Sequence, residues 1–136
     1  MKETAGEFEL SALIERKARE LSSGERSRLS VARAGVQDSR LMLLDEPSGR
    51  LDYSHREKLV DILKALADAG KALVLVEHNL DVAARLADEV LTLKEGRVVS
   101  SGTAGEVLHP QALEQVFGVN FRLVEVDGER MLFPRG

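Results

Sequence analysis

The chain has 136 residues, of which 43% are hydrophobic and 31% charged, and its formal net charge is −4. This composition predicts one globular domain and argues against a dedicated nucleic-acid-binding protein. Because the chain has no cysteine, disulfides and thiolate metal sites are excluded. No apolar run approaches the roughly 20 residues that a membrane-spanning helix needs.

Two helices are predicted before the first strand. Apolar residues at helical spacing indicate a short helix within residues 8–20. A second helix follows the turn "LSSGE" (residues 21–25), where Ser22 or Ser23 can be the N-cap. The same polar, glycine-containing turn could instead bind an anion, through its backbone N–H groups and the Ser23 hydroxyl. Both interpretations stay open on these residues alone.

The middle of the chain is typical of a strand, a helix and a second strand. Residues 41–44 ("LMLL") and 72–76 ("ALVLV") are continuous apolar runs, as in strands that are buried on both faces. Between them, residues 54–70 predict an amphipathic helix that ends at Gly70. We therefore expect a parallel βαβ unit.

The last third of the sequence predicts a short helix, a β-hairpin, a helix in two pieces and a second hairpin. The residues that mark these boundaries are Asn79 or Asp81, Glu95-Gly96, Pro110 and Asp127-Gly128. The expected fold is α/β, with a parallel βαβ core, helices on both faces and a C-terminal β-hairpin.

Two adjacent acids, Asp45 and Glu46, end the first predicted strand. Like charges beside an apolar interior are costly unless a counter-charge offsets them. In open α/β sheets the carboxyl ends of the strands are where ligands bind. Asp45 could hold a Mg²⁺ ion there, and Glu46 could polarise a water for in-line attack on phosphorus. A solvated pair of acids that opens a loop is the alternative.

His78 follows the second predicted strand, at the same edge of the sheet as Glu46. A histidine at this place could donate a hydrogen bond to a phosphate oxygen. A histidine at a strand end can equally be structural. We assign no role to His55 or His109.

Taken in order, the "LSSGE" turn, the strand ending in "DEP", the "LD" that follows and the strand ending in "EH" resemble the ATP-binding cassette (ABC) ATPases. The resemblance covers nearly the whole chain and implies a partial P-loop NTPase fold. It places the signature turn at residues 21–25, the Walker B strand at 41–45, the D-loop at 48–52 and the switch histidine at His78.

This resemblance implies that ATP and Mg²⁺ are bound. It implies that Asp45 coordinates Mg²⁺ through water, that Glu46 orients the attacking water and that His78 contacts the γ-phosphate. The other implied nucleotide-binding residues lie in the signature turn and the D-loop: Ser22, Ser23, Gly24, Glu25 and Asp52. The turn is implied to reach an ATP held by a second protomer. Ser23, in place of a usual glycine, and Arg50, at the expected dimer seam, depart from the family pattern.

The family's phosphate-binding loop, G-x-x-x-x-G-K-[ST], does not occur in these 136 residues. The sole Gly-Lys pair, Gly70-Lys71, follows a predicted helix instead of opening one. The chain therefore resembles the C-terminal half of a cassette, and we expect a fragment or truncated reading frame that does not hydrolyse ATP alone. The expected parts are a helical subdomain (1–40), the nucleotide-binding core (41–108) and a C-terminal appendage (109–136).

Residues 93–119 resemble the ATPase subunits of bacterial importers, and residues 113–134 resemble the subgroup that imports iron-siderophore, haem or cobalamin. The implied partners are a second protomer in a homodimer, transmembrane permease subunits and, indirectly, a periplasmic or extracellular binding protein, with no nucleic acid. The implied location is peripheral, on the cytoplasmic face of the plasma membrane.

Two alternatives stay open. The segment "VEHN" (residues 76–79) resembles the switch of DNA-repair ABC ATPases, although those proteins carry cysteine-ligated zinc modules and this chain has no cysteine. A non-catalytic, regulatory half-cassette is the second alternative.

Overall fold

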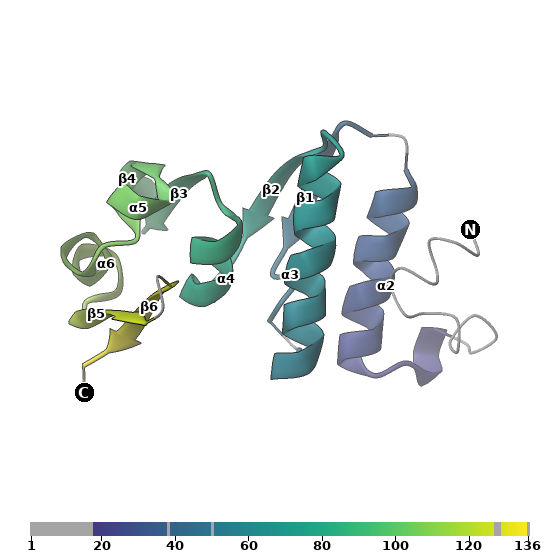
Figure 1. Ribbon diagram of the computed structural model, residues 1–136, viewed down its shortest axis with the longest axis horizontal. Coiled ribbons are helices and arrows are strands. Elements are labelled where there is room, and N and C mark those ends of the chain that lie inside the picture. Colours follow the sequence, from purple (N-terminus) through teal and green to yellow (C-terminus); the bar gives the residue numbers. More distant parts are fainter. Residues whose placement is uncertain (1–17, 38, 50, 127–128, 136) are drawn as a thin grey trace. The chain divides into compact units, whose positions relative to one another are not determined.

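The computed structural model describes residues 18–37, 39–49, 51–126 and 129–135. The chain divides into two compact units, Met1–His78 and Asn79–Gly136, which we call the N-terminal and C-terminal units and describe separately. Figure 1 shows the order of their elements along the chain.

The N-terminal unit begins, within the described residues, with the 3₁₀ turn η2 (Ala18–Glu20) and the helix α2 (Ser23–Val36). Ser22 is the N-cap of α2, as predicted: its Oγ accepts from the backbone N–H of Glu25 at 3.1 Å. The carboxylate of Glu25 accepts in return from the Ser22 backbone N–H at 2.6 Å, which completes a capping box. The predicted helix within residues 8–20 lies mostly outside the described residues.

The predicted βαβ unit is present in the N-terminal unit. Strand β1 (Leu41–Asp45) and strand β2 (Ala72–Val76) pair in parallel, with Asp45 opposite Val76. Helix α3 (Tyr53–Asp68) connects them and ends before Gly70, whose φ of 86° is readily adopted without a Cβ. Figure 1 shows α2 and α3 side by side.

The core of the N-terminal unit lies between these helices and one face of the β1–β2 sheet. The helices contribute Val31, Ala32, Leu59, Val60 and Leu63, the strands contribute Met42, and all six side chains are buried. Because Leu59 and Leu63 are four residues apart, they lie on the same face of α3, as the amphipathic pattern predicted.

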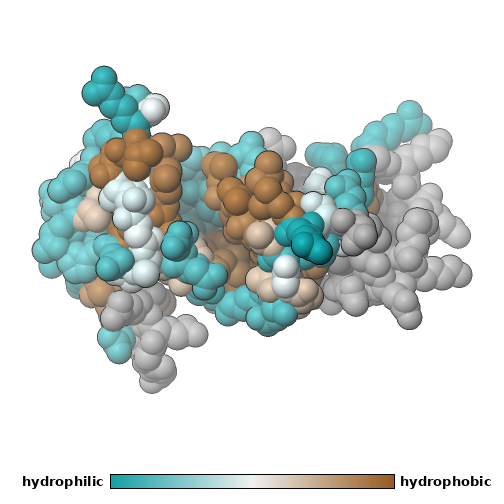
Figure 2. Space-filling view, turned by 90° about the horizontal axis from the view of Figure 1, so that it is seen from above, coloured by the Kyte–Doolittle hydropathy of each residue, from teal (hydrophilic) through white to brown (hydrophobic). Residues whose placement is uncertain are grey.

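The other face of the β1–β2 sheet is exposed, which differs from the prediction of strands covered on both faces. The exposed fractions are Leu41 50%, Leu43 71%, Val74 52% and Val76 53%. Figure 2 shows hydrophobic surface in this region and over the first β-hairpin of the C-terminal unit. Within the described residues, α2 and α3 contact the strands, and no further element covers this second face. The strands therefore carry more apolar surface than the described part of the chain buries.

The C-terminal unit begins with helix α4 (Leu80–Leu86), strand β3 (Glu89–Lys94) and strand β4 (Arg97–Thr103). Asn79 is the N-cap of α4, and its Oδ1 accepts from the backbone N–H groups of Asp81 and Val82. The hairpin between β3 and β4 turns at Glu95 and Gly96, which both have positive φ, as predicted.

The rest of the C-terminal unit also follows the prediction where it is described. The predicted two-piece helix is α5 (Ala104–Val107) and α6 (Pro110–Phe117), with Pro110 at the start of the second piece. Strands β5 (Phe121–Val126) and β6 (Glu129–Pro134) pair antiparallel. Their predicted turn at Asp127-Gly128 lies outside the described residues.

The start of α5 gives a testable pH effect. The Thr103 hydroxyl and the Thr103 backbone N–H donate to the Glu106 carboxylate at 2.8 and 3.0 Å, and these bonds lower the pKa of Glu106. A lowered pKa means that this stabilisation is present above the unfolded pKa and is lost as the pH falls through the folded one. In an NMR titration, Glu106 should titrate below an ordinary glutamate.

Thr103→Val removes the hydroxyl and should raise the Glu106 midpoint part of the way back, since the backbone donor remains. Thr92→Val, the same change in β3, should leave that midpoint unmoved. An unchanged midpoint in Thr103→Val would contradict the assignment of the pKa shift to the hydroxyl.

Candidate functional site

The carboxyl ends of β1 and β2 lie at one edge of the sheet and bring the segments after them together. The Glu46 backbone N–H donates to the Val76 carbonyl at 2.9 Å, which extends the strand pairing by one bond. Glu46 itself has a φ of 45°. This left-handed conformation costs a residue with a side chain on the order of 1 kcal/mol. It turns the chain sharply, and the Gly49 N–H closes the turn on the Glu46 carbonyl at 3.1 Å.

The turn places Glu46 against His78. Glu46 Oε1 and His78 Nε2 are 2.7 Å apart, although the two residues are 32 positions apart in the sequence. An ionised carboxylate only accepts hydrogen bonds, so the proton in this contact belongs to Nε2. The His78 side chain is 74% exposed and that of Glu46 51%, so both can reach a bound molecule. The structure thus brings together the two residues predicted to be catalytic.

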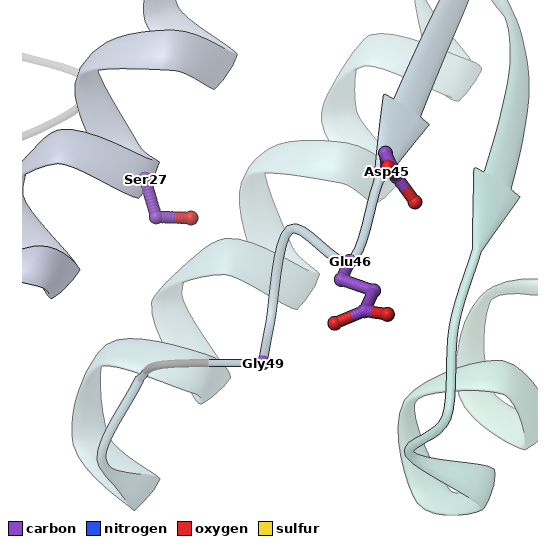
Figure 3. A pocket seen from close by; sticks show the side chains of 4 residues that line it. All are labelled: Ser27, Asp45, Glu46 and Gly49. Atoms are coloured by element: carbon purple, nitrogen blue, oxygen red, sulfur yellow. The ribbon is translucent and has the colours of Figure 1, made fainter.

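A pocket of about 310 Å³ opens beside this pair, lined by Ser27, Asp45, Glu46 and Gly49. Figure 3 shows Ser27 pointing from α2 toward the loop that carries Glu46 and Gly49. The Ser27 hydroxyl donates to the Pro47 carbonyl at 2.6 Å, which ties α2 to the loop after β1. A residue of α2, the helix that starts at the signature turn, and both acids therefore line the same pocket.

The pocket also bears on the Mg²⁺ ion that the family resemblance implies. Mg²⁺ in nucleotide sites is held by one or two carboxylates, with water and phosphate oxygens as its other ligands. Asp45 is exposed at the end of β1 and lines the pocket, which fits that kind of site. Within the described residues, no cluster of three or more acidic, His or Cys side chains forms a complete metal cage. The residues present thus fit a cation bound mostly by water and phosphate.

The signature turn lies at the start of α2, where Ser22 and Glu25 form the capping box. The helix-cap interpretation is therefore satisfied in the structure, where the backbone N–H groups of Ser22 and Glu25 both donate within the capping box. Gly24 is half-buried in the first helical turn, while the side chain of Ser23 is outside the described set. Ser27 is the α2 residue among the described residues that line the pocket beside Glu46, and no residue of the signature turn is among them.

The last predicted site residue, Asp52, is the N-cap of α3. Its Oδ1 accepts from the His55 backbone N–H at 2.9 Å, and its Oδ2 lies 2.7 Å from His55 Nδ1. The sequence assigned nothing to His55, yet an aspartate at an N-cap three residues before a histidine was a readable signal for this pair.

The sequence prediction missed a second contact between the two segments. Ser48 is 2% exposed, and its hydroxyl donates to Glu77 Oε2 at 2.8 Å. The Ser48 backbone N–H donates to Glu77 Oε1 at 3.1 Å. The sequence positions alone could have suggested this contact, because Ser48 follows Glu46 by two residues and Glu77 directly precedes His78 at the same sheet edge.

No helix in the described part of the chain has the length and apolar character that a membrane-spanning segment needs.

Comparison with known proteins agrees with this geometry. The family model described as ABC transporter matches residues 1–49. The hemin import ATP-binding protein HmuV of Rhodococcus jostii is 36% identical over 126 residues, which cover 91% of this chain and 43% of that protein. The vitamin B12 import ATP-binding protein BtuD of Shigella boydii is 36% identical over 139 residues, covering 97% of this chain and 56% of that protein. The chain spans about half the length of the curated relatives it matches.

Solved structures show the same fold. A metal-chelate type ABC transporter in an inward-facing conformation matches with a TM-score of 0.84 and 22% identity, covering 98% of this chain and 55% of that one. An ATP-binding cassette in a dimeric, post-hydrolysis state bound to ADP and Pi matches with a TM-score of 0.68 and 28% identity, covering 76% and 45%. The prediction from the sequence is confirmed: the chain has part of the P-loop NTPase fold and belongs to the ABC transporter ATPases, with hemin and vitamin B12 import proteins among its relatives.

Proposed function

We propose that this chain is the C-terminal part of the ATP-binding subunit of an ABC importer for iron chelates, haem or cobalamin. The observation that carries the proposal is the 2.7 Å contact between Glu46 and His78 beside a pocket that Asp45 also lines. The hemin and vitamin B12 import relatives support the class of cargo.

In the proposed reaction Glu46 is the general base. Its Oε1 is engaged by His78 Nε2, which fixes the carboxylate, and its second oxygen can accept from a water beside the pocket. His78 could also donate its Nε2 proton to an oxygen of a bound terminal phosphate in place of Glu46. Asp45 would hold Mg²⁺ through water, and the ion would neutralise the phosphate oxygens.

The signature turn is proposed to act on a second protomer. Ser23 and Gly24 open α2, so their backbone N–H groups and the helix dipole can receive the γ-phosphate of an ATP bound by the partner. The Ser22 hydroxyl, whose oxygen caps the helix, can donate its hydrogen to the same phosphate. Glu25 would hold the turn through the capping box, and Asp52 would hold the D-loop through the start of α3. Homodimerisation is part of this proposal.

The proposed partners of the dimer are transmembrane permease subunits and, through them, an external binding protein. The location would be the cytoplasmic face of the plasma membrane. We further propose that residues 1–40 belong to the helical subdomain, 41–108 to the nucleotide-binding core and 109–136 to an appendage.

ATP turnover tests the proposal. The 136 residues lack the phosphate-binding loop, so we expect no Mg²⁺-dependent turnover from the chain alone. A fusion that places a segment with the G-x-x-x-x-G-K-[ST] loop of an ABC transporter ATPase before residue 1 should hydrolyse ATP. Turnover is measured as phosphate release with and without Mg²⁺.

The same fusion with the loop lysine replaced by alanine is the matched control and should lose turnover. A folded fusion that binds ATP but does not hydrolyse it would contradict the assignment of Glu46 and His78. Mg²⁺-dependent turnover by the pure 136-residue chain would contradict the expected inactivity.

A further inference from the structure

We propose that Glu77 is a positioning residue that acts through Ser48 to hold Glu46 against His78. The proposal rests on the proposed function, because it concerns the geometry of that same pair. Glu77 is absent from the residues that line the described pocket, so a direct role in the reaction is not part of the proposal.

The first step is the contact itself. Both oxygens of the Glu77 carboxylate accept from one residue, Oε2 from the Ser48 hydroxyl at 2.8 Å and Oε1 from the Ser48 backbone N–H at 3.1 Å. Ser48 is 2% exposed, so water does not compete for its hydroxyl. Hydrogen bonds to a charged carboxylate are stronger than bonds between neutral groups. The two bonds therefore form a firm clamp, which we call the Ser48–Glu77 clamp.

The second step is where the clamp acts. Ser48 lies two residues after Glu46, and Glu77 directly precedes His78. The loop after β1 and the segment after β2 are thus joined twice, by the clamp and by the 2.7 Å contact between Glu46 and His78. The clamp and the pair therefore hold the same loop against the segment that follows β2.

The third step is the backbone of Glu46. Its φ of 45° is unfavourable for a residue with a side chain, so neighbouring bonds must maintain it. The Gly49 N–H bond to the Glu46 carbonyl closes the turn, and Ser48 lies within that turn. Without the clamp, we expect the turn to relax toward an ordinary conformation and to carry the Glu46 carboxylate away from His78.

The first experiment follows amide hydrogen exchange of the 136-residue chain by NMR. Glu77→Ala should speed exchange of the Gly49 amide by about 10-fold, the loss expected for bonds to a charged group, and should leave β1 amides unchanged. Ser48→Ala removes the hydroxyl alone and should give a smaller increase. Ser48→Thr retains both donors and should restore slow exchange. Glu77→Gln keeps one acceptor oxygen and loses the charge, so its exchange should lie between that of Glu77→Ala and that of the parent. Asp61→Ala, an exposed acid on α3, is the control and should change nothing.

The second experiment measures ATP turnover in the fusion. Glu77→Ala should lower kcat by about 10-fold with the KM for ATP within about twofold, and Glu77→Gln, which keeps one acceptor oxygen, should recover part of kcat. If Glu77→Ala does not fold, the milder Ser48→Ala carries the test. Unchanged Gly49 exchange together with unchanged kcat would overturn the proposal. If the unsubstituted fusion has no turnover, the proposed function fails, while the exchange experiment still decides whether the clamp holds the turn.

Discussion

Glu46→Gln is expected to reduce ATP turnover of the fusion by about 10²–10⁴-fold, the range typical of losing a general base. The amide has nearly the shape of the carboxylate, and its oxygen can still accept from His78 Nε2, which lies 2.7 Å from Glu46 Oε1 in the unsubstituted chain. It cannot take a proton from water. Because the geometry is kept and the basicity is lost, kcat should fall while ATP binding is retained. Single-turnover hydrolysis and equilibrium binding of ATP measure the two quantities separately.

Asp61→Asn is the matched control for this substitution. It makes the same change from carboxylate to amide on the exposed side of α3 and should keep full turnover. A Glu46→Gln fusion with turnover within about twofold of the parent would show that another group activates the water, since general-base loss is far larger. Glu46 and His78 would then be a structural pair only.

The meeting of Glu46 and His78 could be predicted because it follows from topology. Two continuous apolar runs with a helix between them imply parallel strands, and parallel strands end at one edge of the sheet. The observed register, with Asp45 opposite Val76, puts the residues after them side by side. The direct hydrogen bond between the pair could not be predicted, because it depends on the left-handed backbone of Glu46.

The Ser48–Glu77 clamp was missed for a different reason. A serine in a loop and a glutamate after a strand are both residues that usually face water. Their contact requires the turn at Glu46, which buries Ser48 to 2% exposure. No periodic pattern in the sequence reports that turn. By contrast, the β3–β4 turn at Glu95 and Gly96 and the break at Pro110 depend on local backbone preferences, and both were predicted from the sequence.

The covering of the β1–β2 sheet was predicted for both faces and is found on one. Apolar residues alternate to both sides of a strand, so a continuous apolar run indicates the environment on both sides. On one side Met42 is buried; on the other Leu43 is 71% exposed. The apolar run therefore indicates strands suited to burial on both faces, whereas the described residues bury one face of them.

Leu63→Ala is expected to lower the free energy of unfolding of the 136-residue chain by about 2–5 kcal/mol. Leu63 is 0% exposed in α3, so its removal leaves a cavity in the core of the N-terminal unit. Alanine and leucine both favour helix, so the loss comes from packing and not from helix propensity. Urea unfolding followed by circular dichroism measures it as a shift of the midpoint at constant slope.

Leu43→Ala is the matched control, because it deletes the same atoms from a leucine that is 71% exposed. Little buried surface is lost there, so the free energy of unfolding should change by less than about 1 kcal/mol. Equal losses at both positions would mean that Leu43 is buried in solution. A loss at Leu43 that grows with protein concentration would then identify association through the exposed face of β1–β2, because stabilisation by binding depends on concentration. A loss at Leu63 below about 1 kcal/mol would instead contradict the assignment of that residue to a well-packed core.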